Sequence, residues 1–457
     1  MSERELLRRT AEIAADFVET LDERSIWPPA TVDELRAALG GPLPAEPSDP
    51  LDVVEALAAA AEPGVVGIPS GRYFGFVIGG ALPAALAADW LTSVWDQNAG
   101  LVIGGPSAAV CEQVAGEWLK DLLGLPETAS FAFVTGCQMA HVTCLAAARH
   151  EVIRQVGWDV EANGLAASPP ITLITGSRKH VTVDRALRLL GLGSEGTRRV
   201  DVDTHGRMRP DALEAALQDT AGPTIVCVQA GEVNTGAFDS IDEIAELCAA
   251  AGAWLHVDGA FGLWAAASPE LRHLTRGVER ADSWATDAHK WLNVPYDSGL
   301  AFVAHPEAHR AAMRLTAEYL VTQESAARDQ MDWTPEFSRR ARGFAVYAAL
   351  RSLGRSGVAE LVEASCARAR QFAAAVTDLP GCEVLNDVVL NQVLFRFEDD
   401  TTTSAMLASV QESGEAWMSG TIWDGRAAIR LSVSNWRTTE ADVDRTVAAF
   451  AAARVAV

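Results

Sequence analysis

Five short apolar runs with helical sequence between them most constrain the fold of this chain. Strands that are apolar along their whole length are typical of a parallel sheet covered by helices on both faces. The sequence therefore predicts an α/β fold with a mainly parallel sheet, in which ligands bind at the carboxyl ends of the strands. The predicted strands cover residues 130–134, 171–174, 224–228, 253–257 and 300–303.

Asp258 and Lys290 form the clearest chemical pattern in the chain. Asp258 directly follows the apolar run 253–257, and Lys290 follows His289 in an apolar and aromatic stretch. A lysine amine forms a Schiff base with the aldehyde of pyridoxal 5′-phosphate (PLP), and a carboxylate keeps the pyridine nitrogen of this cofactor protonated. We therefore predict a PLP site in which Lys290 and Asp258 are catalytic. The alternative is a surface lysine and an unrelated aspartate at a strand end.

The composition argues against several classes of function. The chain has 457 residues, 49% of them hydrophobic and 21% charged, which is enough for two or three folded domains. Its net charge of −24 argues against binding to nucleic acid or to an anionic membrane, because both need a basic surface. The charged start and the lack of a long apolar run argue against a leader or a membrane span. Seven cysteines without metal-binding spacing favour a cytoplasmic protein with no metal site.

The pattern divides the chain into three parts. Residues 1–70 are predicted to be helices broken by proline-rich linkers, and residues 71–335 form a large domain around the sheet. Residues 336–457 begin with long helical sequence and continue with short strands and a final helix. This last part is predicted to be a small α+β domain.

Three further segments carry candidate binding residues. Gly136, Cys137 and Gln138 lie between a strand and a helix, and the free N–H groups and dipole of a helix start suit a phosphate. His180 follows a polar turn and could stack on a flat ring, although a lone histidine is more often an ordinary polar residue. The loop 229–236 either binds a ligand or is an ordinary turn capped by Thr235.

Arg430 lies inside the apolar run 429–433. A buried arginine needs an anionic partner, and its planar guanidinium pairs with a carboxylate through two hydrogen bonds. The natural candidate is the α-carboxylate of a substrate.

The order of these features along the chain resembles that of a known enzyme family. A small-residue turn, a histidine, a strand-end aspartate, a His-Lys pair and a late arginine follow one another as in the group II PLP-dependent amino acid decarboxylases. That family includes aromatic-amino-acid, glutamate and histidine decarboxylases and has the aspartate aminotransferase fold, also called fold type I. The resemblance extends from about Tyr73 to the C-terminus and is most specific at 236–242, 256–260 and 287–292.

The resemblance implies a role for each candidate residue. Lys290 would be the Schiff-base lysine, Asp258 would pair with the pyridine nitrogen, and His180 would stack on the ring and deliver protons. The family works on amino acids as a homodimer with active sites at the subunit interface. The other cofactor-binding residues would be Gly136, Cys137, Gln138, Thr235, Ala260, Asp287 and His289, and the substrate-binding residues would be Tyr73, Phe74, Trp95 and Arg430.

Three features depart from the family pattern. The phosphate turn has fewer Gly, Ser and Thr residues than is usual, and His141 replaces a small amide or alanine. Glu232 replaces a neutral residue and could repel an acidic substrate, pair with a basic one or point to solvent. The segment 322–339, in the place of the family's mobile catalytic loop, has no tyrosine to protonate the carbanion. The expected tyrosine position is near Gln330, and glutamine cannot act as a general acid.

We therefore predict a PLP-dependent carboxy-lyase that decarboxylates an L-amino acid, and the aromatic residues near its site favour an aromatic substrate. Without the loop tyrosine, His180 would donate the proton, or oxygen would intercept the carbanion and give an aldehyde by oxidative deamination. An aminotransferase and a lyase that cuts another carbon–carbon bond are alternatives. A catalytically idle homologue has less support, because Lys290, Asp258 and His180 are all present.

Overall fold

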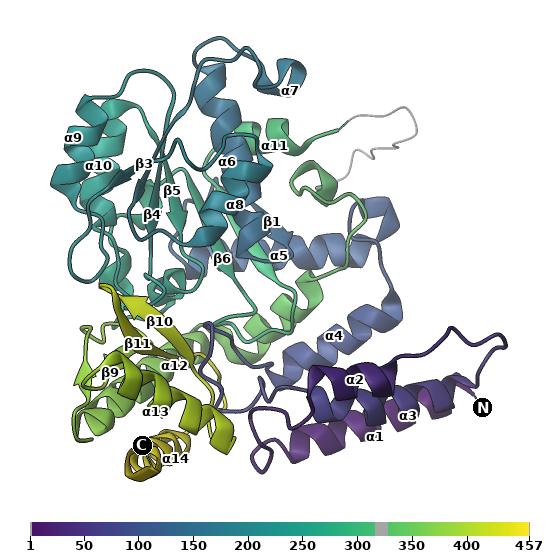
Figure 1. The fold of residues 1–457 in the computed structure, drawn as a ribbon. Coiled ribbons are helices and arrows are strands. Elements are labelled where there is room, and N and C mark those ends of the chain that lie inside the picture. Colours follow the sequence, from purple (N-terminus) through teal and green to yellow (C-terminus); the bar gives the residue numbers. More distant parts are fainter. Residues whose placement is uncertain (1, 316–327, 457) are drawn as a thin grey trace.

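Seven strands form a central sheet in the order β1-β7-β6-β5-β4-β2-β3 (Figure 1). The structure is a computed structural model that describes residues 2–315 and 328–456. β7 is antiparallel to its neighbours β1 and β6, and the other neighbouring strands are parallel, which confirms the predicted fold class. The strands are β1 (Ser130–Val134), β2 (Thr172–Gly176), β3 (Arg198–Val200), β4 (Thr224–Gln229), β5 (Trp254–Asp258), β6 (Ser283–Asp287) and β7 (Gly299–Val303).

The hydrophobic pattern does not predict β3 and β6. β3 is a three-residue edge strand that contains two arginines. β6 has the sequence Ser-Trp-Ala-Thr-Asp and is buried along its whole length. Its polar side chains find partners on neighbouring elements, as when Trp254 donates its indole N–H to Ser283 Oγ (2.9 Å). Polar groups can be buried when they have hydrogen-bond partners, so contacts with other elements decide that this segment forms a buried strand.

Alternate residues of the strands pack into two separate hydrophobic layers. Leu173 and Ile225 face the layer that contains α6 and α8. Ile174 and Val226 face the opposite layer, which contains α5, α9, α10 and part of α12. The period of two along each strand therefore places helices on both faces, as Figure 1 shows. The helices around this sheet are α4 (Pro83–Trp95), α5 (Pro106–Leu122), α6 (Cys137–Arg154), α7 (Val160–Asn163), α8 (Val181–Leu189), α9 (Pro210–Gln218), α10 (Ile241–Ala251) and α11 (Pro306–Met313).

A four-stranded antiparallel sheet in the order β10-β11-β9-β8 forms the core of the C-terminal part. α12 connects it to the large sheet. Val346 and Val362 of this helix pack in the core of the large sheet, and Phe372 and Val376 pack in the core of the small one. The helix bends at Gly354, which has φ 60°. The elements are β8 (Glu383–Val384), β9 (Gln392–Arg396), β10 (Ser419–Trp423), β11 (Arg426–Ser432), α12 (Gly343–Thr377), α13 (Asp400–Ser413) and α14 (Glu440–Ala456).

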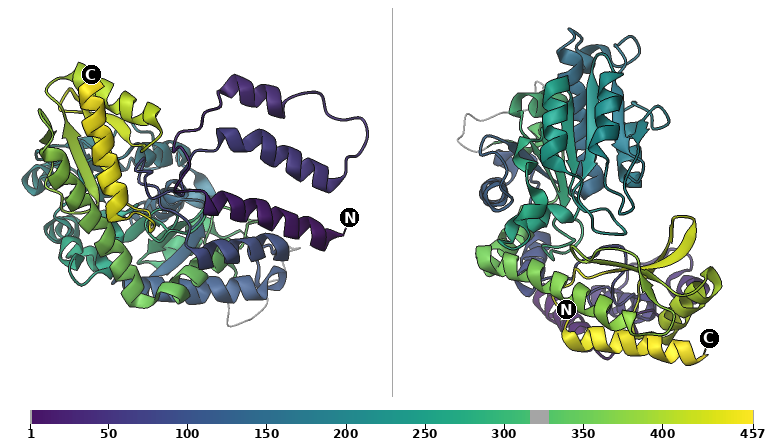
Figure 2. Two further views of the ribbon diagram at one scale, coloured as in Figure 1. Left: turned by 90° about the horizontal axis from the view of Figure 1, so that it is seen from below. Right: turned by 90° about the vertical axis from the view of Figure 1, so that its left-hand side faces the viewer.

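Three N-terminal helices project from the rest of the chain (Figure 2, left). They are α1 (Glu3–Glu19), α2 (Val32–Leu39) and α3 (Pro50–Ala61), and their N-caps are Ser2, Thr31 and Asp49. These three helices lie wholly in the described part of the chain, and none of their residues is fully buried. Short 3₁₀ helices complete the fold: η1 (Glu62–Gly64), η2 (Val102–Gly104), η3 (Gly262–Ala267), η4 (Arg272–Thr275), η5 (Val278–Arg280) and η6 (Gln330–Asp332).

Among the described residues, none of the helices combines the length and the apolar character that a membrane crossing requires.

Candidate active site

A cavity of about 370 Å³ lies at the carboxyl ends of β4, β5 and β6. Parallel strands bring their carboxyl ends to one edge of the sheet, and this edge is the usual ligand site of such folds. Arg430 reaches the cavity from β11, so both sheets contribute to its wall. The predicted site residues that line it are Gly136, Cys137, Gln138, His180, Asp258, Ala260, Asp287, His289, Lys290 and Arg430.

Asp287, the last residue of β6, connects the lysine to the start of α6. Its Oδ2 lies 3.3 Å from Lys290 Nζ, and its Oδ1 accepts the backbone N–H of Cys137 at 2.6 Å. His289 Nε2 lies 3.5 Å from the same Oδ1. One buried carboxylate therefore orients the lysine amine and the first turn of α6 together.

Lys290 is singled out by elimination as well as by position. The chain contains three lysines, and all of them are in the described part. Lys120 lies 2.9 Å from Glu117 and Lys179 lies 2.7 Å from Asp184, and neither lysine lines the cavity. Lys290 is thus the one lysine amine that a ligand in this cavity could meet.

Asp258, the last residue of β5, presents its carboxylate to the same cavity. Its Oδ1 accepts the backbone N–H of Ala260 at 3.2 Å, and its Oδ2 lies 3.5 Å from His141 Nε2. Burial raises the pKa of this carboxyl, but the neighbouring His141, through its hydrogen bond, and His180 and Lys290 outweigh burial and hold the pKa below its usual range. Asp258 is therefore an anion at neutral pH, as a partner for a protonated ring nitrogen must be.

His180 is fixed as the N-cap of α8. Its Nδ1 accepts the backbone N–H of Thr182 at 3.3 Å and lies 2.7 Å from the hydroxyl of the same residue. Burial lowers the pKa of His180, although Asp258 opposes this shift. The ring is therefore neutral, and because Nδ1 is an acceptor its proton is on Nε2.

The start of α6 fits a phosphate group. The positive end of this 18-residue helix faces the cavity through Gly136, Cys137 and Gln138. Two buried polar atoms on the cavity wall, Gln138 Oε1 and Arg430 Nε, have no hydrogen-bond partner within the described residues. A buried polar atom without a partner is costly, and an anionic ligand would remove that cost at Arg430. With the lysine, the carboxylate and the histidine, this donor set fits PLP.

Comparisons with known proteins agree with the geometry. The family model described as "Pyridoxal-dependent decarboxylase conserved domain" matches residues 33–398. The chain belongs to this family. An aromatic-L-amino-acid decarboxylase from Bacillus atrophaeus is 28% identical over 95% of this chain and 92% of its own length. A phenylacetaldehyde synthase from Arabidopsis thaliana is 25% identical over 94% of this chain and 91% of its own length.

A crystal structure of Oryza sativa TDC with PLP and tryptamine has the same fold. Its TM-score is 0.91 at 23% identity, and the match covers 99% of this chain and 96% of that one. Because the matched family is one of pyridoxal-dependent enzymes, the cofactor of this chain is PLP.

Three aromatic residues predicted to contact the substrate do not line the cavity of this decarboxylase. Tyr73 stacks on Trp417 with 5.2 Å between ring centroids, and Phe74 is buried in the core of the small sheet. Trp95 is 49% exposed and packs edge-on against Phe344. The family resemblance placed them in a substrate pocket at a subunit interface, whereas within one subunit they pack outside this cavity.

Two other aromatic side chains, Phe76 and Phe261, line the cavity, and sequence reasoning missed both. Phe76 is 56% exposed, and it and Val77 have φ values of 57° and 59°. This left-handed conformation is unfavourable for residues with side chains and is concentrated at functional sites. The only sequence signal was the aromatic character of the segment that starts at Tyr73.

Thr235 also lies outside the cavity wall. Its hydroxyl donates to the carbonyl of His205 at 2.7 Å. The Glu232 carboxylate accepts the backbone N–H groups of Asn234 and Thr235 at 2.7 and 2.8 Å, and Glu232 is only 2% exposed. Glu232 therefore closes its own loop and does not point to solvent, and this closure turns Thr235 away from the cavity.

Gln330, the expected position of the loop tyrosine, begins η6 and is fully buried. Its side-chain amide donates to the carbonyl of Ala109 at 3.2 Å, which is a packing role. Residues 322–327 of the predicted catalytic loop lie outside the described residues.

The contact between Gly299 and Gly136 leads to a prediction for cofactor binding. A Cβ on residue 299 would lie 2.3 Å from the carbonyl carbon of Gly136, so Gly299→Ala must displace the phosphate turn. Overpacking strain of about 1–3 kcal/mol corresponds to roughly a 5- to 150-fold loss of PLP affinity, measured by equilibrium dialysis. Gly196→Ala is the control, because nothing lies within 4 Å of its added Cβ. Equal affinities in the two variants would contradict the prediction.

Proposed function

We propose that this protein decarboxylates an aromatic L-amino acid, with Lys290 as the residue that binds PLP. The observation that carries the proposal is the meeting of Lys290, Asp258 and Arg430 in one cavity. Phe76 and Phe261 on the cavity wall, and relatives whose names refer to aromatic amino acids and their products, support an aromatic side chain on the substrate.

Each of the residues around the cavity has a separate role in the proposed reaction. When bound, PLP withdraws electrons from the α-carbon of an amino acid. Asp258 keeps negative charge against the ring nitrogen, and this electrostatic effect depends on the carboxylate staying ionised. Arg430 carries a guanidinium with an unsatisfied Nε and suits the α-carboxylate of the substrate. His180 presents an Nε2–H group as a proton donor.

A second candidate function is an aldehyde synthase, and one observation favours it. In residues 2–315 and 328–456 no tyrosine lines the cavity, so the proton that completes decarboxylation needs another donor. If protonation is slow, oxygen can react with the carbanion instead. The Arabidopsis thaliana phenylacetaldehyde synthase is similar to this chain over almost its whole length.

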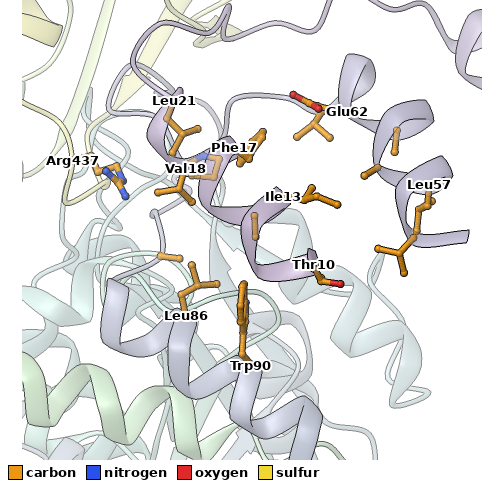
Figure 3. A pocket seen from close by; sticks show the side chains of 17 residues that line it. Thr10, Ile13, Phe17, Val18, Leu21, Leu57, Glu62, Leu86, Trp90 and Arg437 are labelled. Atoms are coloured by element: carbon orange, nitrogen blue, oxygen red, sulfur yellow. The ribbon is translucent and has the colours of Figure 1, made fainter. Parts of the chain in front are cut away.

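We further propose that the protein is a homodimer. An apolar groove of about 500 Å³ lies between α1, α3 and α4. In Figure 3, Ile13 and Phe17 from α1, Leu57 from α3 and Trp90 from α4 face this groove. Leu57 is 56% exposed and Trp90 is 43% exposed, so a single chain leaves much of the groove surface uncovered. A second copy of the chain would bury it and bring the active sites toward the interface.

The thiols support a reducing compartment such as the cytoplasm. All seven cysteines are unpaired, and five of them are buried. A secreted protein would usually pair its cysteines in disulfides.

Reduction with borohydride tests the lysine assignment. The reduced adduct of PLP should map to the peptide that contains Lys290, and Lys290→Ala should lose the visible absorbance of the bound cofactor. Lys179→Arg is the matched control and should keep this absorbance, because Lys179 is paired with Asp184 outside the cavity. An adduct on Lys120 or Lys179 would refute the assignment.

The products distinguish the two candidate functions. The PLP-loaded protein is incubated with phenylalanine, tyrosine and tryptophan, with and without oxygen, and the products are identified by mass. We expect CO₂ and the amine in both atmospheres. Aldehyde, ammonia and hydrogen peroxide formed only with oxygen would establish the synthase instead. Pyridoxamine phosphate without CO₂ would indicate an aminotransferase.

Substitution in the groove tests the homodimer. Leu57→Glu should raise the dimer dissociation constant at least about 100-fold, because each of two copies loses about 1.5 kcal/mol or more of apolar burial. Sedimentation would then show the 48.6 kDa monomer. Leu43→Glu, at a leucine that is 94% exposed and outside the groove, should leave the dimer intact. A monomeric wild-type protein would disprove the proposal.

A further inference from the structure

One face of β5 carries a row of buried polar side chains that ends at the active site. Trp254, His256 and Asp258 alternate along the strand, so they point to the same side of the sheet. All three are buried, and His256 is fully inaccessible to solvent. Two bridging residues, Ser283 on β6 and His141 on α6, fill the spaces between them, and both are also fully buried.

Hydrogen bonds connect this row without a break up to the last contact. Trp254 Nε1 donates to Ser283 Oγ at 2.9 Å, and Ser283 Oγ lies 2.9 Å from His256 Nδ1. His256 Nε2 lies 2.9 Å from His141 Nδ1. The other nitrogen of His141, Nε2, lies 3.5 Å from Asp258 Oδ2. The row of hydrogen-bonded side chains thus extends from the start of β5 to its carboxyl end, and its members lie on β5, β6 and α6.

The positions of the protons on His256 and His141 follow from the residues at the two ends of the row, Trp254 and Asp258. Burial, and then the proximity of His141, lowers the pKa of His256 to about 3, so His256 is neutral. If Ser283 donates to His256 Nδ1, then His256 Nε2–H donates to His141 Nδ1, and the proton of His141 is on Nε2. If these hydrogen bonds ran the other way with both histidines neutral, His141 Nε2 would direct a lone pair at the ionised Asp258.

An additional proton on this row of hydrogen-bonded side chains would not change the contact between His141 Nε2 and Asp258. With both nitrogens of His141 protonated, Nδ1–H donates to His256, whose Nδ1–H then donates to Ser283 Oγ. His141 Nε2–H faces Asp258 in this arrangement also. Cys137 Sγ lies 3.4 Å from the same Nε2, but burial keeps the pKa of this thiol well above its usual range, so it does not add a competing negative charge.

We propose that His141 is a positioning residue for the cofactor. It donates Nε2–H to Asp258 and is held in that orientation by His256, Ser283 and Trp254, so that Asp258 stays ionised and directed at the pyridine nitrogen of PLP. The inference rests on the proposed function, in which Asp258 meets that nitrogen.

The test compares variants of the PLP-loaded protein. His141→Phe keeps a ring of similar size and removes the donor, whereas His141→Gln keeps an N–H donor. Ser283→Ala breaks the contact with His256, and Ser283 is three contacts away from Asp258. His309→Phe is the matched control: His309 is equally buried and is held by Ser130 and Trp333, neither of which lines the cavity. Circular dichroism and thermal unfolding check that each variant folds.

Two readouts report on the ring nitrogen rather than on turnover. The first is the ¹⁵N resonance of PLP labelled at its ring nitrogen, and the second is the PLP dissociation constant. His141→Phe should move the resonance toward the unprotonated position and raise the dissociation constant roughly 10- to 100-fold, the loss typical when the hydrogen-bond partner of a metal-ligating residue is removed. Ser283→Ala should shift both in the same direction by less. His141→Gln should stay close to wild type, and His309→Phe should change neither readout.

The outcomes separate this inference from the proposed function. A folded His141→Phe variant with wild-type resonance and affinity would overturn the role of His141, while the Lys290 assignment would stand. A shift in His141→Phe without any shift in Ser283→Ala would overturn the part of the chain beyond His141. A wild-type protein that binds no PLP at Lys290 would instead refute the proposed function itself.

Discussion

The buried carboxylate of Asp287 is the interaction on which the active site depends. It contacts the amine of Lys290, the imidazole of His289 and the backbone N–H of Cys137 at once. A carboxylate at 3% exposure is stable only when donors surround it, so the end of β6, the following turn and the start of α6 must come together. Lys290 and the turn proposed to bind phosphate are therefore positioned by the same group.

The residues that suit PLP chemistry and the residues that could supply a proton affect different steps of the reaction. The carboxylates at the strand ends and Lys290 suit the reactions of PLP that the whole family shares. The product depends on how fast a proton reaches the substrate carbon. Relatives of similar identity include a decarboxylase and an aldehyde synthase, so overall similarity does not separate these outcomes. The proposed proton donor, His180, lines the cavity, and no tyrosine among the described residues does so.

The sequence by itself determined the fold class, and it predicted ten residues that the structure brings together in one cavity. The apolar strands were recognisable because a parallel sheet buries both faces, and Asp258 was recognisable because it ends one of them. Lys290, His180 and the turn at Gly136 could be placed because their order along the chain resembles that of a known enzyme family. β6 escaped prediction, since the side chains that make its polar residues tolerable lie on other elements.

Only the tertiary structure decided which side chains reach the cavity and which support it. Tyr73 stacks on Trp417 and Phe74 packs in the core of the small sheet, whereas Phe76, whose backbone is left-handed, lines the cavity itself. The link from His141 to Asp258 joins a helix to a strand more than a hundred residues away. Hydrophobic periodicity shows which face of an element is buried, but it does not show which residues of other elements it will meet there. Those meetings depend on packing in three dimensions.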